Sequence, residues 1–390
     1  MKILLTTVFD YPHPGGLSVH VATLKAGLEA RGHEVDILSI SDVPKAKQNL
    51  YARGPSFLLN KFSKGKGIIW SRIARKRMLL NLINAHKGKG YDIINAQDTY
   101  ATFASVESGI PTVSTVHGYM AYEAVSKGSV IEHSAEAKQL QAKETEGYRK
   151  TRRVITVDQR IKDYVMKQAG VNGTAIRNFI DIDGFKPDKE NKLAYRKKHN
   201  VPEDAHVLFC PRRLTKKNGV TYPTLALVEV LKKHPNTVLI YAGSGEERET
   251  IEQLVKENGL ENNVSLLGAI SHDLIKEYYA LSDIVLVPSV HSAGVEEATS
   301  ISALEAMGSG SPLIACAVGG LKEIVDSGVD GLLVQEKNVG ELAAAIVQLI
   351  DEPELADAMA LKARTKIEEE YSHLAAAEKY EAIYLDALGR

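Results

Sequence analysis

One pattern repeats along the whole chain: a short run of β-branched and other apolar residues, then a loop, then an amphipathic segment. The first repeat starts with the apolar run Lys2–Thr7 and continues at helical spacing with Leu17, Val21, Leu24 and Leu28. Gly32 then ends the helical segment. Because this alternation builds parallel strands with helices on both faces, we predict an α/β protein with doubly wound sheets.

Two series of strands are predicted. The first series comprises Lys2–Thr7, Glu34–Ile40, Asp92–Ala96, Thr112–Val116 and Val154–Val157. The second comprises His206–Cys210, Thr237–Ala242, Val264–Leu267, Ile284–Pro288, Leu313–Ala315 and Gly331–Val334. Pro187 and a cluster of charges interrupt the pattern between them, and 390 residues exceed what one core usually organises. We therefore expect two Rossmann-like domains, 1–185 and 186–370.

Composition excludes several classes of protein. Apolar residues make up 44% and charged residues 25%, as in an ordinary globular domain. No apolar run reaches the roughly 18 residues of a membrane span, and the first residues lead directly into a strand, so neither a span nor a signal peptide is expected. Cys210 and Cys316 are too few for a disulfide framework or a structural zinc site. We expect a cytoplasmic protein that does not bind nucleic acid.

Charge is distributed unevenly between the two halves. Residues 1–180 carry 26 Lys and Arg against 15 Asp and Glu, whereas 181–390 carry 22 against 34. The first half is therefore expected to face something anionic. Its segment 61–80 mixes cations with Ile68, Trp70 and other apolar residues. Such a segment either rests on the inner face of an anionic membrane, holds an acidic acceptor, or packs on a core with a charged outer face.

The segment 291–308 follows a buried strand and holds two carboxylates, Glu297 and Glu305. Thr299 and Ser300 are expected to cap the helix that carries Glu305. The amino end of that helix would attract an anion. Carboxylates would repel phosphate, so we assign them to sugar and ribose hydroxyls. The plain alternative is a solvated helix with incidental acidic residues.

Two further turns follow strands of the second series. Arg213 and Lys217 lie four residues apart after the first strand and could neutralise a diphosphate leaving group. A basic surface turn is the alternative. Gly243 and Gly245 follow the next strand and would allow close backbone approach to a ligand.

In the first half, Gly15 and Gly16 join a strand to a helix and could approach a phosphate or sugar. Asp36 lies at the distance along the chain at which a dinucleotide fold contacts ribose, but the third glycine of that fingerprint is missing. This disfavours an oxidoreductase. His117 follows a strand and is expected at a ligand site, although a lone histidine is more often structural.

Taken together, the ordered motifs resemble the retaining glycosyltransferases of the GT-B fold, in particular family 4. The matching elements are Gly15-Gly16, Arg31-Gly-His-Glu-Val35, Thr115-Val-His-Gly118, Asn178-Phe-Ile-Asp181, Arg213-Leu214, Gly243-Ser-Gly245, Glu297 with Glu305, Val318-Gly-Gly320 and Glu323-Ile-Val325. The resemblance covers nearly the whole chain. It implies a nucleotide-sugar donor, most simply a UDP-sugar, on the second domain and an acceptor on the first.

The resemblance also implies roles for individual residues. The donor would be held by Gly16, Arg213, Lys217, Gly243, Gly245, Ala269, Glu297, Thr299, Ser300, Ile301 and Glu305. The acceptor would be held by Gly15, Asp98, His117 and Tyr119. The catalytic set would be His117, Arg213, Lys217 and Glu297.

The family mechanism implied is front-face attack with retention of configuration, in which the leaving phosphate takes the acceptor proton. Neither a metal nor another cofactor is expected, and the final helix, 371–390, would pack back on the first domain. Two departures matter: Asn218 stands where the family has its phosphate lysine, and Ala298-Thr299-Ser300 replaces its Gly-Phe-Gly. A sugar-nucleotide epimerase and a catalytically silent scaffold of the same fold remain alternatives.

Overall fold

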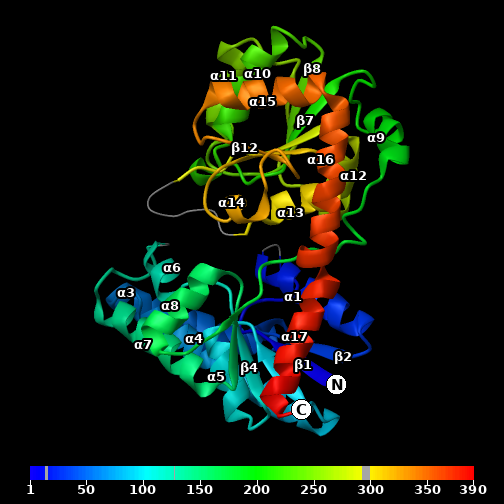
Figure 1. Cartoon of the computed structure of the whole chain (residues 1–390). Helices are drawn as coiled ribbons and strands as arrows, with labels where there is room; N and C mark the ends of the chain where they lie inside the picture. Colours follow the sequence, from blue (N-terminus) through cyan, green and yellow to red (C-terminus); the bar gives the residue numbers. More distant parts are fainter. Residues whose placement is uncertain (14–15, 127, 292–298) are drawn as a thin grey trace. The chain divides into compact units, whose positions relative to one another are not determined.

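A computed structural model describes residues 1–13, 16–126, 128–291 and 299–390 (Figure 1). Its described part contains two parallel six-stranded sheets, which confirms the α/β class. The first sheet consists of β1 (Lys2–Thr6), β2 (Glu34–Leu38), β3 (Ile93–Ala96), β4 (Thr112–Val116), β5 (Arg153–Thr156) and β6 (Thr174–Ala175). The second consists of β7 (His206–Cys210), β8 (Thr237–Tyr241), β9 (Val264–Leu266), β10 (Ile284–Val287), β11 (Leu313–Cys316) and β12 (Leu332–Val334).

Helices connect the strands of each sheet. Those of the first unit are α1 (Gly16–Ala30), α2 (Lys45–Gln48), α3 (Gly54–Phe62), α4 (Lys66–His86), α5 (Thr99–Glu107), α6 (Met120–Ser126), α7 (Ala135–Lys150), α8 (Gln159–Ala169) and α17 (His373–Leu388). Those of the second are α9 (Lys192–Lys198), α10 (Thr221–Leu231), α11 (Arg248–Glu257), α12 (His272–Leu281), α13 (Ile301–Gly308), α14 (Leu321–Ile324), α15 (Val339–Asp351) and α16 (Pro353–Lys366). No helix in these described ranges is both long and apolar enough to cross a bilayer.

Every strand predicted from the sequence is present, with ends that move by at most two residues. Only β6 was missed. It is two residues long and is defined by its pairing with β5, in which Ile155 lies opposite Thr174 and Thr156 opposite Ala175. So short a strand has no periodicity of its own for a sequence pattern to reveal.

The chain forms two compact units, one of residues 1–178 and 373–390 and the other of residues 179–372. The boundary expected at 185/186 thus differs by seven residues. The chain passes from one unit to the other at 178/179 and again at 372/373. The segments next to these two boundaries lie side by side, because the Ile180 amide donates to the Tyr371 carbonyl at 3.0 Å. The last helix, α17, belongs to the first unit and packs on α1, where a Cβ on Gly27 would stand 2.3 Å from the His373 carbonyl oxygen.

Each sheet has a point at which its strand order reverses. In the first unit the order is β2-β1-β3-β4-β5-β6, so the chain turns in opposite directions on the two sides of β1. In the second unit the order is β12-β11-β10-β7-β8-β9, and the reversal lies between β7 and β10. Figure 1 shows helices on both faces of the first sheet, with α1 and α17 on one side and α4 and α5 on the other. Ligands of doubly wound sheets bind beyond the carboxyl ends of the strands at such reversals.

Candidate functional site

The predicted donor residues of the second unit gather at the carboxyl ends of neighbouring strands. Arg213 follows β7, Gly243 follows β8 and Ala269 follows β9, while α13 starts after β10. The loops contact one another directly, since the Gly243 amide donates to the Gly268 carbonyl at 2.8 Å and the Leu214 amide to the Ser244 carbonyl at 3.0 Å. The order of the strands thus brings together loops that are distant along the chain, and Arg212 and Ser300, 88 positions apart, are hydrogen-bonded.

A buried arginine, Arg212, which no sequence motif marked, holds these loops in place. The Arg212 guanidinium donates to the Ser300 hydroxyl at 3.0 Å, to the Asn218 side-chain oxygen at 2.8 Å and to the Ser289 hydroxyl at 2.9 Å. Asn218 in turn donates to the Arg213 carbonyl at 2.8 Å. Asn218, which departs from the family pattern, therefore helps to shape the loop that presents Arg213. Only the tertiary structure shows that Arg212 is buried while its neighbour Arg213 is exposed.

Gly243 and Gly245 are required because the backbone of the neighbouring loop leaves no room for a side chain at either position. A Cβ on Gly243 would lie 2.1 Å from the Arg212 carbonyl oxygen, and a Cβ on Gly245 would lie 2.2 Å from that of Leu214. Such distances are far below van der Waals contact. The turn is therefore pressed against the loop after β7, which is a different reason for glycine from the ligand approach that the sequence suggested.

Helix α13 begins at Ile301 with Ser300 in the N-cap position. The predicted capping is wrong in its chemistry, because the Ser300 side chain makes no hydrogen bond to the helix amides and instead accepts from Arg212. Thr299 and Ser300 are both buried, and Ile301 is half-buried. The first amides of α13 are accordingly left without a side-chain cap and could receive an anionic or hydroxyl oxygen of a ligand.

Glu305 lies one turn into α13 and is buried. Its Oε2 accepts a hydrogen bond of 2.9 Å from the Tyr279 hydroxyl, and its Oε1 lies 3.9 Å from His272 Nε2. Burial raises the pKa of Glu305 to about 7, although the Tyr279 hydrogen bond and the positive charge of Arg212 oppose the rise. A carboxylate with one oxygen still available for a hydroxyl fits the predicted ribose contact.

The two predicted phosphate ligands are accessible. Arg213 is exposed and Lys217 is half-buried, and neither forms an ion pair with another residue in the described ranges. Ala269 is exposed at the rim of the same loops. The structure therefore leaves both cations available for an anionic ligand, next to a frame that the buried Arg212 organises.

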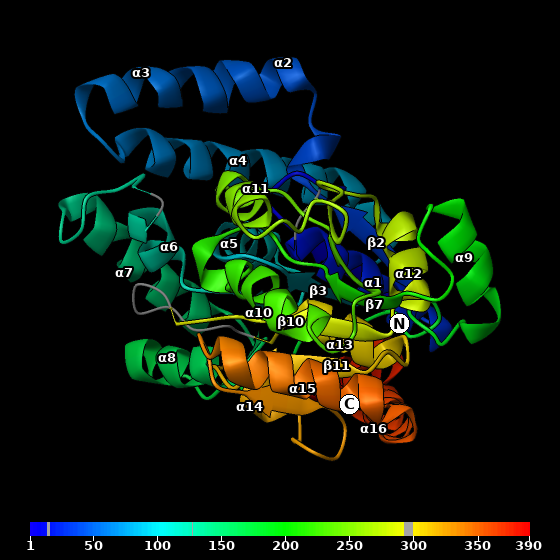
Figure 2. The ribbon, with the colours of Figure 1, turned by 90° about the horizontal axis from the view of Figure 1, so that it is seen from above.

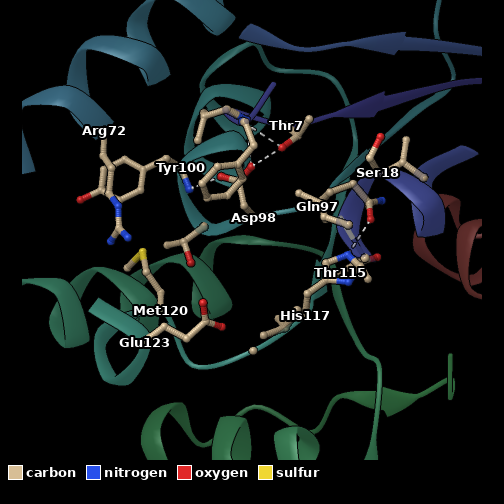
Figure 3. Close-up of a pocket in the computed structure, with 18 of the residues that line it drawn as sticks. Thr7, Ser18, Arg72, Gln97, Asp98, Tyr100, Thr115, His117, Met120 and Glu123 are labelled. Carbon is tan, nitrogen blue, oxygen red and sulfur yellow. Dashed lines mark hydrogen bonds between the residues drawn. The ribbon is translucent and has the colours of Figure 1, made fainter. Parts of the chain in front are cut away.

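The first unit contains a pocket of about 550 Å³ at its own sheet reversal (Figure 3). It is lined by residues that follow β1, β3 and β4 and by side chains from α1, α4 and α6. Gly16, Asp98 and His117, all predicted from the sequence, line it. Tyr119 does not; its ring packs edge-on against Tyr164 with centroids 4.8 Å apart.

His117 is held in a neutral, oriented state. Burial lowers its pKa to about 4, and its Nε2 lies 2.9 Å from the Gln97 side-chain oxygen. A neutral ring with Nε2–H donating to Gln97 keeps Nδ1 as an acceptor. The ring also meets that of His20 edge-on at 4.5 Å. His117 can therefore orient a hydroxyl but carries no charge near neutral pH.

Asp98 lines the pocket and also positions the neighbouring loops, and its predicted contact with the acceptor stays a prediction. Its carboxylate receives the Val8 amide at 2.8 Å and the Thr7 hydroxyl at 2.9 Å, and it caps α5 by accepting from the Tyr100 and Ala101 amides. Burial raises its pKa, and these hydrogen bonds oppose the rise. With four donors from the protein, the carboxylate holds the loop after β1 against α5 (Figure 3).

Two donors in the pocket have no hydrogen-bond partner among the residues that the structure describes. They are Nη1 of Arg72 and Nε2 of Gln97, both buried. The Arg72 guanidinium carbon lies 5.9 Å from the centroid of the Tyr100 ring, and Figure 3 shows Arg72 reaching from α4 toward Met120 and Glu123. An unsatisfied buried donor is costly, which points to a ligand as its partner. The sequence marked only the basic segment around Arg72, not the side chain that enters the pocket.

Two predicted residues lie outside the described ranges. They are Gly15, assigned to the acceptor, and Glu297, assigned to the donor sugar. Their roles stay predictions.

Comparisons with known proteins agree with this architecture. Residues 14–183 match the family model "Glycosyltransferase Family 4" and residues 191–366 match "Glycosyl transferases group 1". An uncharacterised glycosyltransferase of Methanocaldococcus jannaschii is 28% identical, with 95% of each chain covered. Two solved structures at 20% identity share the fold. Sucrose-phosphate synthase from Thermosynechococcus elongatus matches with a TM-score of 0.72, and the match covers 100% of this chain and 99% of the synthase chain. HepE from Anabaena, solved with UDP, matches with a TM-score of 0.71, and the match covers 99% of this chain and 100% of the HepE chain.

The two matches together span most of the chain, and the reversed sheets of both units correspond to this fold. The chain therefore belongs to the GT-B glycosyltransferases of group 1 and family 4.

Proposed function

We propose that the chain transfers a sugar from a UDP-sugar to an acceptor hydroxyl with retention of anomeric configuration, in the synthesis of a cell-envelope polysaccharide, a glycolipid or a glycoside. The observation that carries the proposal is the frame in which buried Arg212 binds Ser300 at the start of α13, while its neighbours Arg213 and Lys217 form no ion pair within the described ranges. Such a cluster suits a diphosphate. The UDP complex of the HepE structure supports the choice of base.

In the proposed reaction the acceptor oxygen attacks the anomeric carbon while the bond from that carbon to the β-phosphate oxygen breaks. The departing phosphate takes the acceptor proton. Arg213 and Lys217 stabilise the negative charge that grows on the diphosphate, which is the main catalytic contribution expected of fixed cations. Glu305 accepts hydrogen bonds from ribose hydroxyls, and Glu297 contacts the donor sugar.

The pocket of the first unit is proposed to hold the acceptor. His117 would orient a hydroxyl, and Nη1 of Arg72, which has no hydrogen-bond partner among the described residues, would donate a hydrogen bond to an oxygen of the acceptor substrate. A carboxylate or phosphate oxygen fits a guanidinium best, because paired charges offset the cost of burying it. We therefore propose an acceptor with an acidic group.

We also propose that no metal or other cofactor takes part and that the enzyme works in a reducing compartment, the cytoplasm, at the inner face of a membrane. Both cysteines, Cys210 and Cys316, are free and buried. The basic segment 61–80 was one candidate for membrane contact. Its apolar residues Ile69 and Leu79 are buried in the first unit, however, so core packing accounts for that face of α4.

A donor screen tests the central proposal. The chain is incubated with UDP-, GDP- and ADP-sugars and paired neutral and acidic acceptor sugars, with and without EDTA, and the released nucleoside diphosphate is measured. Acceptor-dependent release from a UDP-sugar, unchanged by EDTA, is expected. Conversion of the donor without any acceptor would favour an epimerase, and failure to bind any nucleotide sugar by calorimetry would favour a silent scaffold.

A further inference from the structure

The first unit contains a long stretch without a negative charge. Between Asp42 and Asp92 the sequence has no acidic residue and twelve Lys and Arg residues. Six of these cations lie in or beside α2, α3 and the start of α4, are exposed, and form no ion pair with any other residue of the described ranges: Lys45, Lys47, Arg53, Lys61, Lys64 and Lys66. This surface therefore carries a concentrated positive charge that the protein does not neutralise.

Helices α2 and α3, joined by a further helical turn at 49–53, form a hairpin with α4 (Figure 2). The contact is close, because a Cβ on Gly67 would lie 2.1 Å from the Ser56 carbonyl oxygen. The Asn60 side-chain oxygen accepts from the Gly67 amide at 2.9 Å, and Trp70 Nε1 donates to the Tyr51 carbonyl at 2.9 Å. The hairpin is thus tied to α4 by both packing and hydrogen bonds.

This hairpin exposes large apolar side chains as well as cations. Gln48 and Ala52 are buried on its inner side. Large apolar side chains point outward, with exposed fractions of 65% for Leu50, 56% for Tyr51, 63% for Phe57, 57% for Leu58, 89% for Phe62 and 46% for Trp70. We call these six residues the apolar face. An ordinary surface helix places such residues inward, so this face is expected to have an occupant outside the chain.

We propose that the apolar face docks on the surface of an anionic lipid bilayer. Aromatic and leucine side chains would enter the headgroup boundary while the surrounding cations approach anionic headgroups, the combination that holds interfacial helices on membranes. Five of the six cations are lysines, whose compact charge suits diffuse attraction to many headgroups better than paired recognition of one acidic site. This charge pattern favours a bilayer over a protein partner.

The docking surface adjoins the pocket of the first unit. Helix α4 contributes Trp70 to the apolar face, and it contributes Ile68 and Arg72 to the pocket lining. A chain docked in this way would hold the pocket close to the lipid headgroups, where a lipid-linked acceptor with a phosphate would lie. The docking itself requires neither donor nor acceptor, so it can be tested apart from glycosyl transfer.

The test is co-sedimentation of the full chain with vesicles of phosphatidylcholine alone or mixed with phosphatidylserine, at low salt. Binding at least about tenfold stronger to the mixed vesicles is expected, weakening as salt is added. The double variant Leu58→Ser with Phe62→Ser should lose at least about tenfold of that binding, because both side chains are exposed and leave no cavity. The matched control is Leu193→Ser with Leu361→Ser, at positions 56% and 71% exposed in the second unit, which should bind like the wild type.

A charge variant, Lys61→Glu with Lys64→Glu, separates the electrostatic contribution to vesicle binding from the apolar one. It should abolish the preference for phosphatidylserine. Equal binding to both vesicle types, or unchanged binding of the Leu58 and Phe62 variant, overturns the proposal. The proposal is also overturned if the chain does not bind vesicles but sediments as a dimer, and the Leu58→Ser with Phe62→Ser variant dissociates that dimer. The apolar face would then join two copies of the chain. UDP binding measured by calorimetry in the same samples reports separately on the proposed transferase function.

Discussion

The two units use the same sheet reversal in different ways. In the second unit the polar side chains at the reversal bind one another: Arg212 joins Ser300, Asn218 and Ser289 in one buried network. In the first unit the reversal opens into a pocket of about 550 Å³, where Nη1 of Arg72 and Nε2 of Gln97 have no hydrogen-bond partner within the described ranges. Under the proposed function, the second unit would meet the donor diphosphate with a preformed frame, whereas the first unit would need an acceptor to supply partners for these two donors.

The largest effect on turnover is expected from removing Arg213, the cation that the loop around Arg212 holds at the proposed donor site. Arg213→Ala should lower kcat by at least about a hundredfold, because it removes a stabilising charge from the leaving diphosphate. Its melting temperature should stay that of the wild type, since Arg213 is exposed. Turnover is measured as released UDP, and stability by thermal unfolding. Lys216→Ala, at an exposed neighbouring cation, is the matched control.

The adjacent Arg212 sharpens the same prediction. Arg212→Met removes the hydrogen bonds to Ser300, Asn218 and Ser289 and should lower the free energy of unfolding by about 3 kcal/mol, detectable by denaturant titration. If instead the Arg213 variant unfolds early and the Arg212 variant does not, the division between frame and ligand-binding residue is wrong.

A smaller effect is expected in the first unit. Arg72→Met should raise the KM for an acidic acceptor by about tenfold, the loss of one charged hydrogen bond, and leave the KM for the donor unchanged. Steady-state kinetics with each substrate varied in turn measures both constants. Arg77→Met, at an exposed position on the same helix, should change neither constant. An equal rise in the KM for the acceptor and the KM for the donor would show that Arg72 does not bind the acceptor specifically.

The smallest effect concerns pH. Because burial raises the pKa of Glu305 to about 7, the carboxylate that is proposed to bind ribose forms only as pH rises through that value. UDP affinity should increase by about threefold to tenfold from about pH 6 to about pH 8, as measured by calorimetry. Glu305→Gln should remove this part of the increase while keeping the part that arises from titration of UDP itself. Identical pH profiles for the two proteins would contradict the assignment.

The same group links pH to stability in the unliganded protein. Its pKa is higher in the folded protein than the usual 4.5 of an exposed glutamate, so the folded state binds more protons between these values. Stability contributed by this group is therefore present at low pH and is lost as pH rises from about 4.5 through about 7. Chemical denaturation of the wild type and of Glu305→Gln across that interval measures the difference.

Sequence patterns predicted the strands and the polar turns, but not which side chain of a turn is buried. Arg212 and Arg213 are chemically identical neighbours after β7, and only the packing of the 243–245 turn and α13 against them assigns one to the interior. Likewise, Ser300 was expected to cap α13 from its position, yet Arg212 competes successfully for its hydroxyl. Competition between local and distant partners has no signature in a local motif.

The basic segment shows the same limit on a larger scale. Cations and apolar residues at 61–80 suggested a surface for lipid, but Ile69 and Leu79 pack inside the first unit. Phe62 and Trp70 of this segment are exposed, but the other four residues of the apolar face lie at 50–58, which the sequence did not single out. Periodicity identifies two faces of a helix, and only its neighbours decide which face turns inward.

What the sequence alone determined is what local chemistry controls: alternating strands and helices, turns at strand ends, the paired carboxylate motif and the uneven charge of the two halves. Tertiary structure decided which of these residues meet. The buried network around Arg212, the pocket that receives Arg72 and the outward apolar face of the hairpin all depend on contacts between distant segments. Such contacts follow from how sheets reverse and helices pack, and no single stretch of sequence contains that information.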